Sequence, residues 1–205
     1  MLSVRGDLRS ALLDAADRLI RDRGARGVTT REIAREAGCS DGALYVHFAD
    51  KAHLLASLCE RWLPDLKSAI GDLLNQVGAD TVSANLEGIA RTAIRSYRDM
   101  VITQFAIAGD PELLGHHRAG MQATGNGPRR GIEAMAAYLA AEQRLGRVRT
   151  DADCTMAAAI FLGACWSRAA VCHYTGDDVI SIDDASYAAR LATTLMQGLE
   201  PGGRQ

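Results

Sequence analysis

Residues that can do chemistry are present in this 205-residue chain, but not in the patterns that catalysis or metal binding requires. His116 and His117 are adjacent, and neighbouring side chains on a helix point about 100° apart, so a surface or pocket-rim role competes with metal binding. We find no H-E-x-x-H motif, glycine-rich phosphate loop, nucleophile elbow or paired carboxylates. We therefore expect no enzyme activity, no metal and no cofactor, with an all-helical enzyme as the alternative of a different class.

The cysteines are odd in number and include no C-x-x-C pair, so they fit neither a disulfide framework nor a zinc site. We interpret them as small buried apolar residues, and a thiol sensor is the alternative. They are Cys39, Cys59, Cys154, Cys165 and Cys172.

The spacing is most informative between Gly27 and Lys51, where it predicts two short helices joined by a tight turn at residues 38–40. Thr29 and Glu32 have the spacing of a capping box, and Ser40 precedes a second helix over Asp41–His47. The miniature core is expected to consist of Ile33, Ala34, Ala37, Cys39 and Leu44. A module of this kind lays its second helix in the major groove of DNA, whose width suits one α-helix.

The elements around this module are also expected to be helical, because Ala and Leu recur at helical spacing and no stretch alternates like a strand. We predict an all-α fold of eight or nine helices. The first covers residues 7–23, and Asp50 caps a fourth. Pro64 falls in the continuation of the fourth helix and predicts a kink or a break there. Further helices are expected over residues 65–77, 83–108, 111–121, 128–145, 153–174 and 182–199.

The expected organisation is a three-helix helix-turn-helix domain over residues 1–53 and a helical ligand-binding and dimerisation domain over residues 54–205. The formal net charge of the chain is −2, so a nucleic-acid contact must come from a local patch. Residues 1–23 are charged throughout, and the longest apolar run, residues 156–166, is too short to span a bilayer. We therefore expect a cytoplasmic protein without membrane contact.

About the first 55 residues of the chain, which include the module between Gly27 and Lys51, resemble the DNA-binding domain of the TetR/AcrR family of repressors. The residues that carry the resemblance are Thr30, Ile33, Ala34, Gly38, Gly42, Leu44, Tyr45, Phe48 and Lys51. The resemblance implies a homodimeric, ligand-responsive repressor that binds a palindromic operator in double-stranded DNA and is released by a small effector.

The resemblance also implies roles for single residues. Thr30, Tyr45 and Lys51 would contact phosphates, and His47 would contact a phosphate or the groove. Arg31 would reach a base edge, and arginine has the shape to bind guanine O6 and N7 together. The residues expected to face the bases are Asp41, Gly42, Ala43 and Val46.

Other interpretations of these residues stay open. The alternatives are a half-buried core position for Tyr45, a plain surface charge for Lys51, and for Asp41 a role confined to the first turn of its own helix. Residues 1–53 hold nine basic against eight acidic groups, so we expect modest non-specific affinity for DNA. Arg31 and the shape of the DNA would then carry more of the specificity.

The apolar surface of the last two predicted helices suits a subunit interface. Paired with their two-fold mates they would form a four-helix bundle, as in the family, and packing within the chain alone is the alternative. The expected interface residues are Ile160, Phe161, Gly163, Ala164, Trp166, Leu191 and Leu195.

An effector pocket is expected among the helices between residues 66 and 145. Its candidate lining residues are Trp62, Leu66, Ile70, Tyr97, Met100, Val101, Gln104, Phe105, Met121, Met135 and Tyr138. Their apolar character indicates an apolar or aromatic ligand, with ordinary core positions as the alternative. The alternative function is a helix-turn-helix regulator whose C-terminal domain only dimerises or binds a protein partner, and activation is an alternative to repression.

Overall fold

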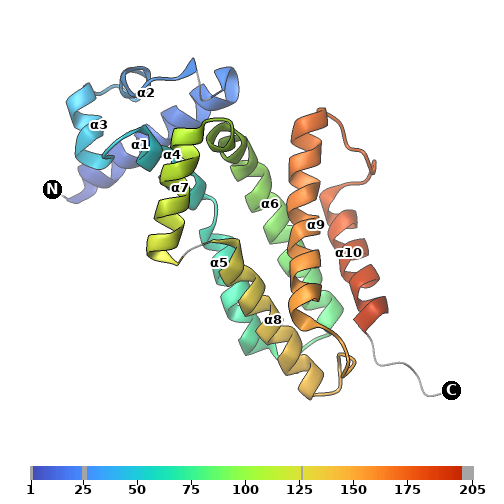
Figure 1. Ribbon diagram of the computed structural model, residues 1–205. Coiled ribbons are helices and arrows are strands. Elements are labelled where there is room, and N and C mark those ends of the chain that lie inside the picture. Colours follow the sequence, from blue (N-terminus) through green and yellow to red (C-terminus); the bar gives the residue numbers. More distant parts are fainter. Residues whose placement is uncertain (1, 25–26, 126, 200–205) are drawn as a thin grey trace. The chain divides into compact units, whose positions relative to one another are not determined.

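The computed structural model describes residues 2–24, 27–125 and 127–199, and all regular structure in these ranges is helical (Figure 1). The α-helices are α1 (Leu2–Arg23), α2 (Thr30–Glu36), α3 (Asp41–His47), α4 (Lys51–Arg61), α5 (Pro64–Asp72), α6 (Val82–Ala108), α7 (Pro111–Thr124), α8 (Pro128–Arg144), α9 (Cys154–Thr175) and α10 (Asp184–Leu199), and a 3₁₀ turn, η2 (Leu73–Gln76), follows α5. The all-α prediction is confirmed. The predicted number of eight or nine helices is too low, because the chain breaks at Pro64 and does not merely bend there.

The described residues form two compact units. Unit 1 takes in the chain up to Trp62 together with Met100–Thr124, and unit 2 takes in Leu63–Asp99 and the described residues from Gly125 on. The boundary predicted at residue 53 falls inside α4, and the side chains of Leu54, Leu55 and Leu58 on that helix are fully buried. Unit 1 is therefore larger than the predicted 53-residue domain.

Local signals in the sequence set the ends of the short helices in unit 1. The capping box is confirmed, since Thr29 Oγ1 accepts from the Glu32 amide at 3.2 Å and Glu32 Oε2 accepts from the Thr29 amide at 2.9 Å. Ser40 Oγ accepts from the Ala43 amide at 3.3 Å and begins α3, whose predicted bounds are also confirmed. Gly38 joins the two helices at φ +74°, a conformation that glycine adopts without a steric penalty.

The break near Pro64 separates α4 from α5. The helix α4 ends at Arg61, and Pro64 is in the first turn of α5, where its missing amide hydrogen costs no helical hydrogen bond. The predicted helix over residues 65–77 is shorter than expected, because α5 ends at Asp72 and continues only as the tighter turn η2.

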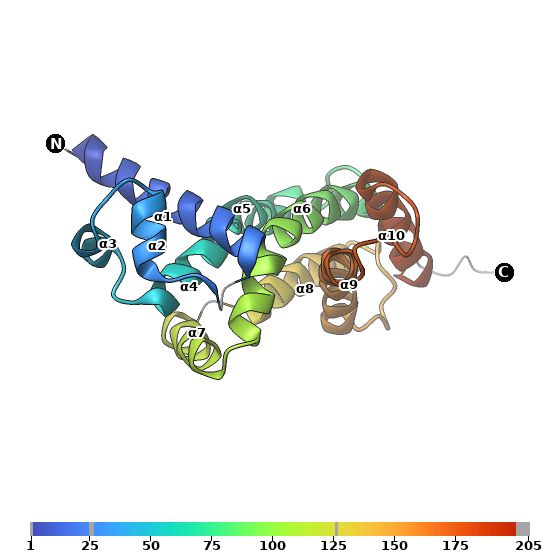
Figure 2. The same cartoon turned by 90° about the horizontal axis from the view of Figure 1, so that it is seen from above.

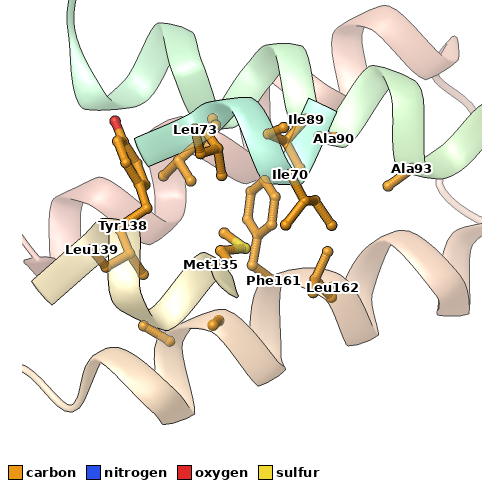
Figure 3. Close-up of a cluster of buried hydrophobic side chains, with 14 of the residues drawn as sticks. Ile70, Leu73, Ile89, Ala90, Ala93, Met135, Tyr138, Leu139, Phe161 and Leu162 are labelled. Atoms are coloured by element: carbon orange, nitrogen blue, oxygen red, sulfur yellow. The ribbon is translucent and has the colours of Figure 1, made fainter. Parts of the chain in front are cut away.

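The core of unit 2 is formed where α5, α6, α8, α9 and α10 meet. Figure 3 shows the ring of Phe161 beside Met135, Ile70 and Leu162. Phe161 and Met135 are fully buried. The helices α8 and α9 lie side by side, and α10 packs on α9 (Figure 1).

A buried carboxylate links two loops at one end of unit 2. Glu142 on α8 is fully buried, and its Oε1 accepts from the amide of Gly78 at 3.1 Å while its Oε2 lies 3.3 Å from Nη1 of Arg147. Burial raises the pKa of the neighbouring Tyr138 hydroxyl to about 12, and that hydroxyl accepts from Asn85 Nδ2 at 2.9 Å. The network therefore ties the segments before α6 and after α8 to the core.

A second buried charge joins α9 to α10. Arg168 is only 3% exposed, and its guanidinium pairs with Asp178 at 2.6 Å and with Asp184 at 3.3 Å. It also lies over the ring of Tyr187, 5.0 Å from the centroid. The hydrogen bond from Arg168 lowers the pKa of Asp178 to about 2, so this carboxylate stays charged in all but strong acid.

Among the described helices, α9 is long and apolar enough by length and composition to cross a membrane. However, 44% of its most apolar stretch is buried inside the protein, and it carries the buried Arg168. These features match the core helix of a folded protein.

We predict that Glu142→Ala lowers the free energy of unfolding by about 3 kcal/mol, because Arg147 and the Gly78 amide lose a buried charged acceptor. Urea denaturation at one fixed protein concentration measures the change. The control is Glu133→Ala on the same helix, whose carboxylate pairs with Arg129 at the surface and should cost no more than about 0.5 kcal/mol. Equal losses in the two variants would contradict the role given to Glu142.

Candidate nucleic-acid interface

The packing of α2 and α3 on α1 leaves one side of α3 in solvent (Figure 2). Leu44 is fully buried, and because a helix repeats every 3.6 residues, positions 42 and 46 lie opposite it and positions 43 and 45 lie on the two flanks. Asp41 and Gly42 are exposed, and Val46 is 72% exposed. Ala43 and His47, which were also predicted to contact DNA, are half-buried.

The first residue of α2 and the fifth residue of α3 meet through their hydroxyls. Thr30 Oγ1 and Tyr45 Oη are 3.1 Å apart and share a hydrogen bond. Tyr45 is 52% exposed, so about half of its surface is open to solvent. Each hydroxyl carries one hydrogen, so while this bond is made one of the two hydroxyls can still donate to an anion.

Lys51 begins α4 and is half-buried. Burial lowers the pKa of its ammonium group, and the carboxylates of Asp110 and Glu32 oppose this shift. The side chain is therefore more than a plain surface charge, since it lies in the field of acids from two other segments of unit 1.

Acidic residues neutralise most arginines around α2 and α3. Arg18 lies 3.4 Å from Glu36 and Arg23 lies 3.2 Å from Glu32. Arg31 is 87% exposed, and its Nε lies 3.8 Å from Oδ2 of Asp41. These carboxylates weaken the local positive field around the three arginines.

One residue was not singled out from the sequence. Arg35 is exposed and lines a shallow hollow together with Arg31, Thr29, Cys39 and Asp41. Its position four residues after Arg31 on α2 was the signal, because residues i and i+4 share one face of a helix.

The thiols of the chain are all free, and two are deeply buried. Burial raises the pKa of Cys59 and Cys165 to about 12, so both stay protonated at neutral pH. These two match the interpretation as small apolar core residues. Cys39, Cys154 and Cys172 are only partly buried.

The predicted effector-lining residues fall into two groups. Leu66, Ile70, Met135 and Tyr138 belong to the packed core of unit 2, and Tyr97 packs against it. The other six lie in unit 1: Trp62, Met100, Val101, Gln104, Phe105 and Met121. The helix α6 contributes residues to both units, which spacing within that helix does not reveal.

Besides Nη1 of Arg61, which forms an ion pair with Asp14, two buried donors in unit 1 lack a hydrogen-bond partner among the described residues. They are Nε1 of Trp62 and Oγ1 of Thr103, and the Thr103 side chain belongs to a fully buried residue. A buried polar group without a partner is costly, so each is a place where a further acceptor would be stabilising.

The predicted interface residues on α9 divide between surface and core. Ile160 is 56% exposed and Trp166 is 41% exposed, whereas Phe161 is fully buried in its own chain. The prediction for Phe161 is therefore wrong, because its helical phase turns it toward Met135. Gly163 is exposed, and Ala164, Leu191 and Leu195 are half-buried. Met156 and Tyr174, which were not predicted, are exposed on the same helix.

Comparison with known proteins gives matches over most of the chain. A family model described as bacterial regulatory proteins of the tetR family matches residues 12–58, and one described as the C-terminal domain of AefR-like transcriptional repressors matches residues 117–195. The transcriptional repressor KstR2 of Rhodococcus jostii is 34% identical over 100 residues, which are 49% of this chain and 47% of that protein. The chain thus matches about half the length of this curated relative.

Two solved structures share the fold. FadR from Bacillus subtilis in complex with stearoyl-CoA superimposes with a TM-score of 0.69 at 16% identity, covering 92% of this chain and 98% of that one. The complex of SmeT, a repressor from Stenotrophomonas maltophilia, with triclosan superimposes with a TM-score of 0.68 at 20% identity, covering 96% and 93%.

The two family models match both the helix-turn-helix module and most of the segment from α7 to α10. With the repressor relative and the shared fold, they confirm the resemblance found in the sequence. The chain belongs to the TetR family of bacterial regulatory proteins.

Proposed function

We propose that this protein is a cytoplasmic transcriptional repressor that binds a palindromic operator as a homodimer and releases it when a small apolar or aromatic effector binds. The observation that carries the proposal is the exposed outer side of α3 beside the hydrogen-bonded hydroxyls of Thr30 and Tyr45. The major groove is wide enough for one α-helix such as α3, and in this proposal the two hydroxyls contact the phosphates of one strand.

Within this proposal, the contacts divide into two kinds. Thr30, Tyr45 and Lys51 bind phosphates and set the position of α3, whereas Arg31, Asp41 and the exposed Val46 face the base edges. Gly42 lets the backbone approach the groove. The half-buried Ala43 also faces the bases, and His47 contacts a phosphate or the groove.

The exposed apolar residues of α9 support dimerisation. Met156, Ile160, Trp166 and Tyr174 are between 41% and 84% exposed in the single chain. Large apolar residues gathered on one helix are typical of an interface between subunits. A homodimer built there presents two copies of α3, which must be about 34–36 Å apart to enter successive major grooves.

The apolar character of the effector is supported by the solved relatives. Their bound ligands, stearoyl-CoA and triclosan, both have large apolar parts. The unpartnered Nε1 of Trp62 and Oγ1 of Thr103 would bind a polar group on such a ligand. The effector lowers operator affinity only if it binds better to the conformation in which the two α3 helices are wrongly spaced.

We predict that Tyr45→Phe weakens operator binding about tenfold, because one hydroxyl-to-phosphate hydrogen bond is lost. The operator is first obtained by selection from random duplex DNA, and fluorescence anisotropy then gives the dissociation constant. The control, Ser68→Ala, removes an exposed hydroxyl of α5 in unit 2 and should leave the affinity unchanged. The phosphate contact is refuted if Tyr45→Phe binds as tightly as the unaltered protein.

We predict that Ile160→Glu converts the dimer to a monomer and abolishes tight operator binding, because it places a charge in the apolar contact of α9. Sedimentation velocity measures the oligomeric state, and the circular dichroism spectrum checks that the chain stays folded. Leu74→Glu alters an equally exposed apolar residue away from α9 and should remain dimeric. If the Ile160→Glu protein is still a dimer, the interface does not lie at this part of α9.

We predict that at least one ligand from a panel of a long-chain acyl-CoA, a steroid and triclosan raises the melting temperature and weakens operator binding. At a concentration 100 times its dissociation constant such a ligand stabilises the native state by about 2.7 kcal/mol. Glutamate, a small polar compound, is the control. If no ligand of the panel or of a wider apolar library has both effects, the regulator without an effector becomes the better description.

A further inference from the structure

Arg31 and Asp41 come from different helices and meet across the hollow between α2 and α3. Their side chains are 87% and 48% exposed, and the Nε–Oδ2 distance is 3.8 Å. An ion pair this exposed is weak, because water screens both charges. The ion pair can therefore break when Arg31 meets a closer hydrogen-bond acceptor or Asp41 meets a closer donor.

Asp41 is an acid on the side of α3 that the proposed function turns toward DNA. Its carboxylate is not used to cap α3, because Ser40 accepts the hydrogen bond from the Ala43 amide. Facing a duplex, a carboxylate is repelled by phosphates and loses its hydration unless a donor replaces the water. In the major groove that donor is the amino group of cytosine.

Arg31 adds the complementary requirement, since a guanidinium binds the O6 and N7 acceptors of guanine. The two side chains are 3.8 Å apart, close to the stacking distance of about 3.4 Å between bases on a strand. They can thus reach one base pair or two neighbouring ones. We propose that Arg31 and Asp41 act as one reading unit that selects a guanine–cytosine pair in each half-site, with Asp41 as the residue that rejects DNA lacking it.

This proposal rests on the proposed function and adds the source of its specificity. On a matching site, Arg31 donates hydrogen bonds to guanine and Asp41 accepts one from the amino group of cytosine. These bonds offset the free energy that is lost when the ion pair breaks. On other DNA, Asp41 faces hydrogen-bond acceptors or phosphates. Arg31 then stays in its ion pair with Asp41 and does not reach a base. The acid therefore weakens binding to non-operator DNA more than binding to the operator.

The test compares the unaltered protein with Asp41→Asn in selections from random duplex DNA and in affinity measurements on the selected duplex and a scrambled one. We expect the ratio of the two affinities to fall about tenfold or more, mainly because the scrambled duplex binds more tightly. The preference for a guanine–cytosine pair should disappear at one position of each half-site. Arg31→Gln should lose the same preference, and adding Asp41→Asn to it should change little further.

Two further variants keep the outcome interpretable. Asp17→Asn removes the same charge from an acid that pairs with Arg21 along α1, so it should tighten both duplexes equally. Asp41→Glu keeps the acid and should keep the discrimination, which also guards against a folding defect at this position. If Asp41→Asn behaves like Asp17→Asn, or selects the same sequences as the unaltered protein, the reading unit is refuted. If the unaltered protein selects no sequence at all, the proposed function itself fails and this proposal fails with it.

Discussion

The burial of Leu44 against the core of unit 1 is the constraint on which the candidate interface depends. In a helix of seven residues, one fully buried position determines the orientation of every other residue. With Leu44 inward, Gly42 and Val46 lie on the opposite side of α3, and Tyr45 on its flank comes within hydrogen-bond distance of Thr30. The short helix α3 has little stability of its own, so this orientation comes from packing and from the Ser40 cap.

Charge pairing in unit 1 gives this interface a particular electrostatic character. Most arginines near α2 and α3 lie beside a carboxylate, so the surface attracts a polyanion only weakly at long range. Affinity must then come from contacts made at short distance, where geometry matters more than net charge. A DNA-binding surface of this kind has low affinity for non-specific DNA, and its affinity depends more strongly on sequence. This agrees with the net charge of −2 of the chain.

Unit 2 combines firmly packed helices with an exposed apolar side on α9. Its helices must pack firmly, and the buried Glu142 and Arg168 networks hold the loops and the α9–α10 pair in place. Yet α9 leaves Met156, Ile160 and Tyr174 in solvent. The polar networks keep the helices ordered without using those apolar side chains. The exposed side of α9 therefore remains available for association, which is the role that the proposed dimer gives it.

The sequence alone determined features that depend on neighbouring residues: the all-α class, the Thr29–Glu32 capping box, the bounds of α3 and the interruption at Pro64, where the ring removes a hydrogen-bond donor. The prediction of which residues face DNA came from the same local pattern. Only the tertiary structure decided that Phe161 lies inside its own chain, that Ala43 and His47 are half-buried, and that the predicted pocket residues belong to two units. These depend on the rotational phase of each helix against distant partners, and apolar periodicity marks a buried face without saying what buries it.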